Sequence, residues 1–289
     1  MHLAGVAGVA YPASESDRFA TAGDDNTVRV WDAGDYSSPV HVAVKGAGHP
    51  SGVQFSTDVL LSGWEDGAIR CHHADTGEQL WVLADSHRGG VSALKLSNNR
   101  RFALSGGVNG AVRVWEMRSR ELVSDLKEHV SEVTQLLLYD DDIHALSCSR
   151  DKSFLAWDLR RETRISSHTQ RMGGIHSIAL TRDQSLIITA GQEKKLTYWD
   201  LREENPVQVI DPAHGSGEAT CISVAAGSDL MVTGGTDHVV RLWDIRMGKT
   251  LMEGVGHSGK VRGISFSPDD KQVVSVGSDG CVLVWNVYQ

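Results

Sequence analysis

A short apolar segment that ends in tryptophan recurs along this chain of 289 residues. The segments are VRVWD, VRVWE, FLAWD, LTYWD, VRLWD and VLVWN, and their tryptophans are separated by 84, 42, 42, 44 and 42 residues. The long gap holds a degenerate copy, AIRCHH, in which His72 takes the tryptophan position. Seven units of about 42 residues therefore fill the chain, and units of this kind stack so that each buries its apolar face against its neighbour. The seven copies end near Trp31, His72, Trp115, Trp157, Trp199, Trp243 and Trp285.

Apolar residues within each copy alternate or run for five to seven positions between turn residues, as in VRGISFSPDDKQVVSVGSDGCVLVW over 261–285. This pattern predicts short antiparallel strands joined by tight turns. A period of about 40 to 45 residues with a W-D ending is typical of a four-stranded propeller blade. The chain thus resembles a WD-repeat β-propeller. The resemblance implies an all-β fold, one domain over 1–289, with seven four-stranded antiparallel blades.

The resemblance also implies a polar network inside each blade, formed by a histidine, a serine or threonine, an aspartate and the tryptophan. Buried turns leave backbone N–H groups that such side chains can satisfy together. Four repeats carry the complete set at matching offsets. These sets are His2, Thr21, Asp25 and Trp31; His129, Ser147, Asp151 and Trp157; His214, Thr233, Asp237 and Trp243; and His257, Ser275, Asp279 and Trp285.

Three repeats depart from this pattern and are expected to be less firmly held. Asn109 replaces the aspartate in the third repeat, Glu193 replaces it in the fifth, and the second lacks the tryptophan. Seven histidines are assigned to the network position and to a structural role. They are His2, His49, His87, His129, His168, His214 and His257.

Charge and motif content argue against several function classes. The chain has 28 Lys and Arg against 37 Asp and Glu, a net charge of −9, which would repel nucleic acid and anionic lipid. It has no apolar stretch long enough to span a membrane and no signal peptide, which predicts a cytoplasmic protein. The acidic run 140–142 is expected to be a solvated turn. The sequence predicts no catalytic residues, cofactor, metal or small-molecule substrate. Four dispersed cysteines are expected to be buried and reduced: Cys71, Cys148, Cys221 and Cys281.

The two ends of the chain leave one strand unaccounted for. His2 aligns with His257, so the first residues already enter the first repeat, and counting predicts 27 strands where seven closed blades need 28. One interpretation is that this is the C-terminal part of a longer protein, which supplies the missing strand. The alternative is a short, open last blade. Either way the last blade would present an edge for strand addition.

Variable loops on a rigid disc suggest protein binding. One face carries the residue before each turn aspartate together with the residues that lead into each first strand. Trp64 lies beside this turn and is either an exposed anchor or a filler of space left by the degenerate repeat. The candidate partner-binding residues are Trp64, Arg88, Arg150, Arg171, Met172 and Lys260.

A second pattern follows the repeat tryptophans. WEMR, WDLR, WDLR and WDIR resemble the W-D-x-R boxes of propellers that dock onto the adaptor of cullin ubiquitin ligases. The resemblance implies an alternative function as a ubiquitin-ligase substrate receptor, with an adaptor-binding surface that needs its arginines exposed on one face. The arginines are Arg160, Arg202 and Arg246.

Stretches outside the generic motif are more specific. LLSGWEDGAIRCHHADTGEQLWVLADSHRGGVSAL over 60–94 and the segment 231–285 resemble the C-terminal propeller of cilia- and flagella-associated WD-repeat proteins of the axoneme. That resemblance implies a non-enzymatic scaffold of the microtubule inner protein type. It would lie in the cytoskeleton of the cilium or flagellum and bind tubulin or neighbouring axonemal proteins.

Overall fold

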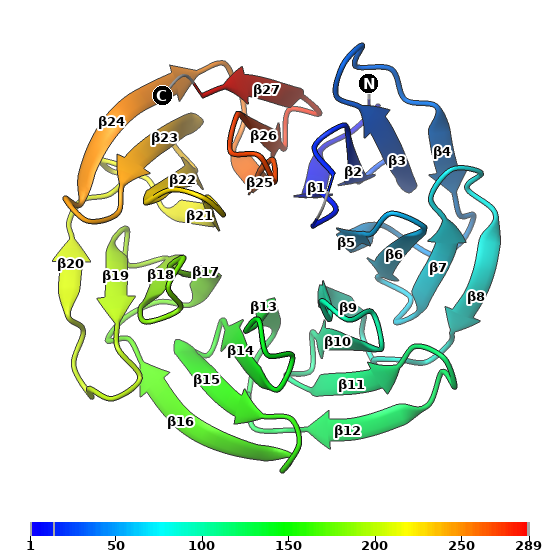
Figure 1. Ribbon diagram of the computed structural model, residues 1–289, viewed down its shortest axis with the longest axis horizontal. Helices are drawn as coiled ribbons and strands as arrows, with labels where there is room; N and C mark the ends of the chain where they lie inside the picture. The colour runs from blue at the N-terminus through cyan, green and yellow to red at the C-terminus, as the bar shows by residue number, and fades with distance from the viewer. Residues whose placement is uncertain (1, 14, 288–289) are drawn as a thin grey trace.

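Seven antiparallel sheets form a ring around a central channel in the computed structural model, which describes residues 2–13 and 15–287 (Figure 1). Each sheet is a blade whose strands run in chain order from the channel outward. The described residues form no helix, and the all-β, seven-bladed prediction is confirmed.

Blades one to three contain four strands each. They are β1 (Val6–Ala10), β2 (Arg18–Gly23), β3 (Thr27–Asp32) and β4 (Val40–Ala43) in blade one; β5 (Pro50–Phe55), β6 (Val59–Trp64), β7 (Ile69–His73) and β8 (Gln79–Leu83) in blade two; and β9 (Val91–Leu96), β10 (Phe102–Gly107), β11 (Val112–Glu116) and β12 (Leu122–Leu126) in blade three.

Blades four to six also contain four strands, whereas blade seven contains three. They are β13 (Val133–Leu138), β14 (His144–Ser149), β15 (Ser153–Asp158) and β16 (Thr163–Thr169) in blade four; β17 (Ile175–Leu180), β18 (Ile187–Gly191), β19 (Leu196–Trp199) and β20 (Gln208–Ile210) in blade five; β21 (Ala219–Val224), β22 (Leu230–Gly235), β23 (Val239–Asp244) and β24 (Lys249–Val255) in blade six; and β25 (Val261–Phe266), β26 (Gln272–Gly277) and β27 (Val282–Asn286) in blade seven.

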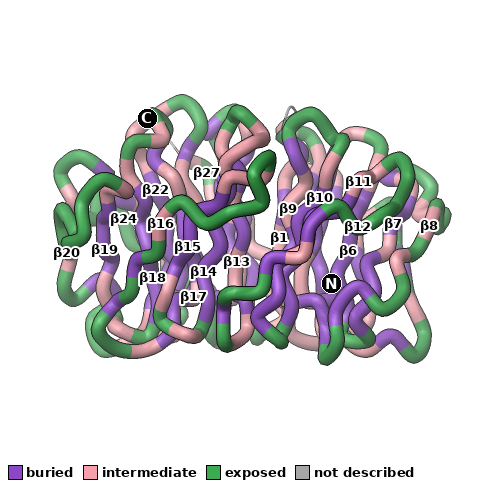
Figure 2. The backbone as a smooth tube through the Cα atoms, turned by 90° about the horizontal axis from the view of Figure 1, so that it is seen from below, coloured by how far each residue is buried: buried purple, intermediate pink, exposed green. Residues whose placement is uncertain are grey.

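The burial of a strand depends on its place in the blade. The second strands are the most buried, and all five residues of β18 are inaccessible to solvent or nearly so. Neighbouring blades stack face to face, so both faces of a second strand are covered and its sequence is a run of small and β-branched residues. The outer strand β24 is exposed at nearly every position. Figure 2 shows this division, with buried segments inside the disc and exposed turns on its two faces.

Close contacts tie each blade to the next. A Cβ on Gly106 would lie 2.6 Å from Cγ1 of Val133, so only glycine allows β10 to approach the next blade this closely. Beside the channel, the Ser92 hydroxyl donates to the Val133 carbonyl at 2.6 Å, and the Thr134 hydroxyl donates to the Ile175 carbonyl at 2.8 Å. These hydroxyl bridges join the first strands of successive blades.

Blade seven meets blade one without sharing a strand. Side chains of β1, β2 and β3 form one apolar cluster with Val274 and Val276 of β26. The Arg262 guanidinium pairs with the Asp24 carboxylate at 2.5 Å across the same junction. Among the described residues, β27 has no strand on its outer side, as the strand count predicts. The ring is therefore closed by side-chain packing and an ion pair.

The four cysteines are free thiols. Cys71, Cys148 and Cys221 are buried, and burial raises the pKa of each to about 12. Cys281 is only partly buried, so the expectation of full burial is wrong for this residue. It follows the blade-seven turn at the edge of a sheet that has one strand fewer.

Candidate functional site

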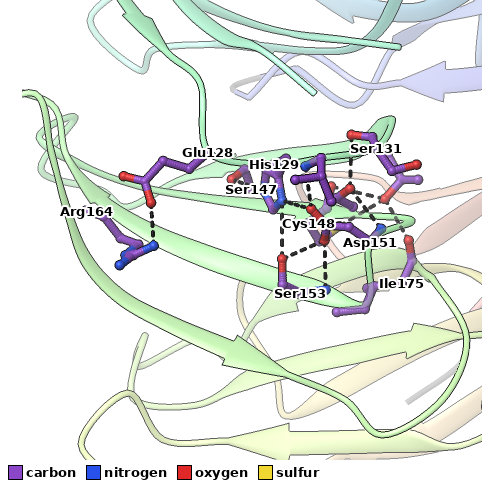
Figure 3. Close-up of polar contacts among 12 residues, drawn as sticks. Glu128, His129, Ser131, Ser147, Cys148, Asp151, Ser153, Arg164 and Ile175 are labelled. Atoms are coloured by element: carbon purple, nitrogen blue, oxygen red, sulfur yellow. Dashed lines mark hydrogen bonds and ion pairs between the residues drawn. The ribbon is translucent and has the colours of Figure 1, made fainter. Parts of the chain in front are cut away.

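Blade four holds a continuous polar network (Figure 3). The Asp151 carboxylate lies 2.8 Å from Nδ1 of His129, and Nε2 of the same ring lies 2.8 Å from the Ser147 hydroxyl. That hydroxyl also accepts the indole N–H of Trp157 at 2.8 Å. The network therefore links the loop before β13, the second strand and the third strand into one unit.

The same contacts recur in blades one, six and seven. Histidine Nδ1 lies 2.9 Å from Asp25, 2.9 Å from Asp237 and 3.0 Å from Asp279. In each blade the serine or threonine hydroxyl bridges the histidine and the tryptophan at 2.7 to 2.8 Å. The structure thus brings together all sixteen residues of the four sets named from the sequence.

The network keeps its carboxylates ionised. Burial by itself would raise the pKa of Asp151, but the Ser153 hydroxyl and the nearby His129 hold that pKa below its ordinary value. The carboxylates of Asp25, Asp237 and Asp279 have lowered pKa values for the same kind of reason. A buried carboxylate that loses these donors would be destabilised, so each network is built to hold a negative charge.

In blade two, Trp64 takes the place of the missing repeat tryptophan, which is one of the two roles that the sequence left open. Trp64 is completely buried at the end of β6, and its indole N–H donates to the Ser62 hydroxyl at 2.8 Å. The prediction that Trp64 binds a partner is therefore wrong, because its ring fills the space left by the degenerate repeat. His72 is also buried, and burial lowers its pKa to about 4.

Two histidines assigned to the network lie elsewhere. His49 is exposed directly before β5, and its backbone carbonyl accepts the backbone N–H of Glu65. His168 lies within β16 and stacks on Phe154, with ring centroids 4.9 Å apart. Both assignments are wrong, because a single sequence does not show how many residues separate the outer strand from the next first strand.

Blade five has no network histidine among the described residues. The Thr189 hydroxyl still accepts the Trp199 indole N–H at 2.9 Å, and Glu193 accepts the Met172 backbone N–H at 2.6 Å. The buried side chain of Gln170 instead donates to the carbonyls of Met172 and Gly173. Glutamate and glutamine thus brace the loop that leads into β17.

One backbone hydrogen bond, repeated in all seven blades, builds the face that we call the loop face. It joins the residue before each turn aspartate, or its replacement, to the residue before each first strand. Arg150 N–H donates to the Glu132 carbonyl at 3.0 Å, and Ser278 N–H donates to the Lys260 carbonyl at 2.9 Å. The donors are Asp24, Glu65, Val108, Arg150, Gln192, Thr236 and Ser278.

The remaining partner-binding candidates are exposed on the loop face. Arg88, Arg150, Arg171 and Lys260 are accessible, and 70% of Met172 is exposed. Arg150 also pairs with Glu132 at 2.9 Å.

The W-D-x-R arginines project from the opposite face, because the turn after a third strand lies at the other end of an antiparallel blade. The side chains of Arg202 and Arg246 are 82% and 79% exposed, and Arg160 is exposed as well. Arg202 pairs with Asp200 at 2.6 Å, and Arg246 pairs with Asp229 at 2.7 Å. Two of the three arginines therefore already form ion pairs with acidic residues of their own blades.

The central channel contains a cavity of about 540 Å³, lined by the first strands. Two of its titratable groups, Tyr11 and Lys95, have shifted pKa values, raised and lowered respectively, and burial is the main cause of both shifts. Within residues 2–13 and 15–287, no three His, Cys, Asp or Glu side chains gather as a metal site would require. No helix in the same ranges is long and apolar enough to cross a membrane.

Sequence reasoning missed the hydroxyl bridges between blades and the Arg262–Asp24 pair. Ser92 and Thr134 each stand one residue after the start of a first strand. That recurrence was visible in the sequence. The Arg262–Asp24 pair joins opposite ends of the chain, and no sequence signal indicates it.

Comparison with known proteins agrees with this geometry. The WD domain, G-beta repeat, matches residues 2–32, 77–116, 204–244 and 248–286, which together are more than half of the chain. The chain is 30% identical over 288 residues to cilia- and flagella-associated protein 52 of Sus scrofa, and 31% identical over 286 residues to the protein of that name from Chlamydomonas reinhardtii. These alignments cover 98% and 96% of this chain but only 46% and 45% of the relatives, so the chain spans about half their length. WD repeat-containing protein 91 of Gallus gallus is 35% identical over 69 residues, 24% of this chain and 9% of that protein.

With the repeats matched and seven blades in place, the chain belongs to the WD-repeat family of β-propeller proteins.

Proposed function

We propose that this propeller is a non-enzymatic scaffold of the ciliary or flagellar axoneme. The observation that carries the proposal is the similarity to cilia- and flagella-associated protein 52, which extends over 98% of the chain rather than over a few repeats. Relatives in a mammal and a green alga are about equally similar to it.

The scaffold contacts tubulin or a neighbouring axonemal protein through its loop face. Five exposed side chains of that face supply cationic and apolar contact groups: Arg88, Arg150, Arg171, Met172 and Lys260. Arginine is enriched at the energetic centres of interfaces. The overall negative charge would oppose binding to an acidic partner elsewhere on the disc, so these cations define the docking position.

Axoneme fractionation tests this function. A tagged protein containing this chain would be expressed in ciliated cells, and the axonemes would be extracted with salt. Retention on the salt-washed doublets is the expected result, and release of the whole pool into the soluble fraction would contradict the axonemal assignment.

Two variants locate the contact. Arg171→Glu reverses a charge on the loop face and should increase the salt-extractable fraction. Lys249→Glu makes the same change on the exposed outer strand β24 and should leave retention unchanged. Equal retention of both variants would remove the Arg171 loop from the proposed interface.

A second candidate function is a ubiquitin-ligase substrate receptor, and one observation favours it. Arg160, Arg202 and Arg246 are all exposed on the face opposite the loop face. Co-purification of the cullin adaptor with the wild-type protein, lost in a variant with alanine at these three positions, would support it. The pairing of Arg202 and Arg246 with acids in their own blades favours the scaffold instead.

A further inference from the structure

In blades one, four and seven the turn aspartate of the polar network makes two kinds of contact. Its carboxylate faces the histidine ring and also accepts the backbone N–H of the residue that follows the histidine. That second bond is 3.0 Å from Leu3 to Asp25, 3.0 Å from Val130 to Asp151 and 2.8 Å from Ser258 to Asp279. The repeat therefore provides an internal standard for what belongs at this point.

Blade three lacks that carboxylate. His87 is 2% exposed and its Nε2 lies 2.7 Å from the Ser105 hydroxyl, as in the complete blades. Its Nδ1 has no hydrogen-bond partner among the described residues, although the Asn109 side chain lies beside it. Because Ser105 accepts the Trp115 indole N–H at 2.8 Å, its own proton is available to Nε2 and Nδ1 carries the ring N–H.

Further donors gather at the same point. The backbone N–H of Arg88 has no acceptor in the part of the chain that the structure describes, unlike Val130 in blade four. The Asn109 side chain accepts from the Ala111 N–H through Oδ1 at 3.3 Å, which leaves its NH₂ group where a carboxylate would present an acceptor. Donors that gather at one point favour an anionic acceptor between them.

The surroundings are cationic on balance. Arg113 and Lys127 both contact Asp125, at 3.3 and 2.7 Å. Asp66 is already paired with Arg70 at 2.5 Å. Arg88 makes no ion pair with a described residue, and of Asp66, Asp85 and Asp125 only Asp85 makes none either. Four cations thus stand against three carboxylates.

A cavity of about 850 Å³ opens onto this point from the loop face. Arg88, Asn109, Arg113, Lys127 and His87 are among the residues that line it. Asn109 itself is exposed, whereas the corresponding Asp151 is partly buried. A side chain from outside can therefore reach the position that an internal carboxylate occupies in the complete blades.

We propose that this blade-three pocket binds the carboxylate of a glutamate or aspartate presented by an acidic segment of a partner protein. One carboxylate oxygen accepts from the Arg88 backbone N–H and the Asn109 NH₂ group, and the other faces the Arg88 and Arg113 guanidinium groups. A surplus of one positive charge matches a carboxylate. Asp66 and Asp85 on the wall disfavour a doubly charged phosphate.

This inference deepens the proposed function, because Arg88 belongs to the loop face, and it names the chemistry of the partner segment. Its test is independent of cilia. Failure of an acidic peptide to bind would overturn the pocket while leaving axonemal retention unaffected, and loss of axonemal retention would leave peptide binding unaffected.

The test measures the binding of fluorescein-labelled hexaglutamate to the full chain by fluorescence anisotropy at low and at physiological ionic strength. Hexaglutamine is the neutral control peptide. Asn109→Asp places a carboxylate inside the pocket and should weaken hexaglutamate binding by about tenfold or more. The same variant should melt at a higher temperature, so weaker binding cannot be attributed to unfolding. Arg88→Gln, a change at an exposed position, should also weaken binding.

A matched control lies in the corresponding turn of blade four. Lys152→Gln removes an exposed cation from the same face and should leave hexaglutamate binding unchanged. The proposal is overturned if hexaglutamate does not bind the wild-type chain, or if Asn109→Asp binds it equally well. It is also overturned if inorganic phosphate displaces the peptide at an equal concentration, because the pocket would then be a general anion site.

Discussion

Blades three and four differ in the turn between their second and third strands. Both place a histidine against a serine, and both hold that serine against a tryptophan, with distances that agree within 0.1 Å. Blade four adds the Asp151 carboxylate, which faces the ring of His129 and binds the next backbone N–H. Blade three has Asn109 instead, and its ring nitrogen and backbone N–H are left without acceptors among the described residues. The carboxylate is therefore not needed to build the blade, but it is needed to satisfy the donors of the turn.

The largest predicted effect is a dependence of stability on pH through His87. Burial, with the Arg113 charge as a smaller cause, lowers the pKa of His87 from 6.5 to about 4. Between these values the unfolded chain binds a proton that the folded chain does not, so stability is lost as the pH falls from 6.5 towards 4. The full contribution is about 3 kcal/mol.

Urea unfolding at several pH values, on the wild type and on His87→Gln, checks this prediction. The variant should lose less stability on acidification, because the group that titrates is gone. Asn109→Asp should also reduce the dependence, since a carboxylate beside the ring raises the pKa of His87. Equal pH dependence in the wild type and His87→Gln would show that His87 does not titrate in this range.

Removal of the blade-four carboxylate is expected to have the next largest effect. Asp151→Ala leaves Nδ1 of His129 and the Val130 N–H without their acceptor, at a cost of about 1 to 3 kcal/mol. Thermal unfolding followed by circular dichroism measures it. Asp140→Ala, at an exposed turn position, is the control and should change stability by less than about 0.5 kcal/mol. An unchanged melting temperature for Asp151→Ala would refute the network role of this residue.

Insertion of the carboxylate into blade three should stabilise the protein by a smaller amount. Asn109→Asp gives the His87 ring and the Arg88 N–H an acceptor and is expected to raise stability by about 1 kcal/mol. Asn286→Asp adds the same charge at an exposed position of β27 and controls for the change in net charge. A fall in the melting temperature of Asn109→Asp alone would show that blade three does not share the geometry of blade four.

The smallest effect is expected at the W-D-x-R turns. Arg202→Ala and Arg246→Ala remove surface ion pairs from side chains that are 82% and 79% exposed. Each should change the free energy of unfolding by less than about 0.5 kcal/mol. Differential scanning fluorimetry of both variants beside Asp151→Ala gives the contrast. A loss as large as that of Asp151→Ala would give these arginines a structural role that their exposure does not suggest.

Much of the network could be predicted because it depends on spacing. An offset of 18 or 19 residues between histidine and hydroxyl residue recurs, and Ser147, Ser275 and Thr233 all follow it. The failures occur where loops change length. His168 precedes the loop that leads into β17 and lies within a strand, and His49 is exposed. Offsets cannot reveal this, because a repeat tolerates insertions between strands.

The sequence by itself determined the number of blades, the strand count and the identity of the four complete networks. These follow from a local period that each repeat restates independently. Only the tertiary structure decided that Trp64 turns inward, that Arg262 and Asp24 meet across the closed ring, and that the donors around Asn109 face an open cavity. Each of these depends on which groups two blades bring together and on what space remains between them. Packing between distant segments sets those distances, and a repeat pattern in the sequence does not determine that packing.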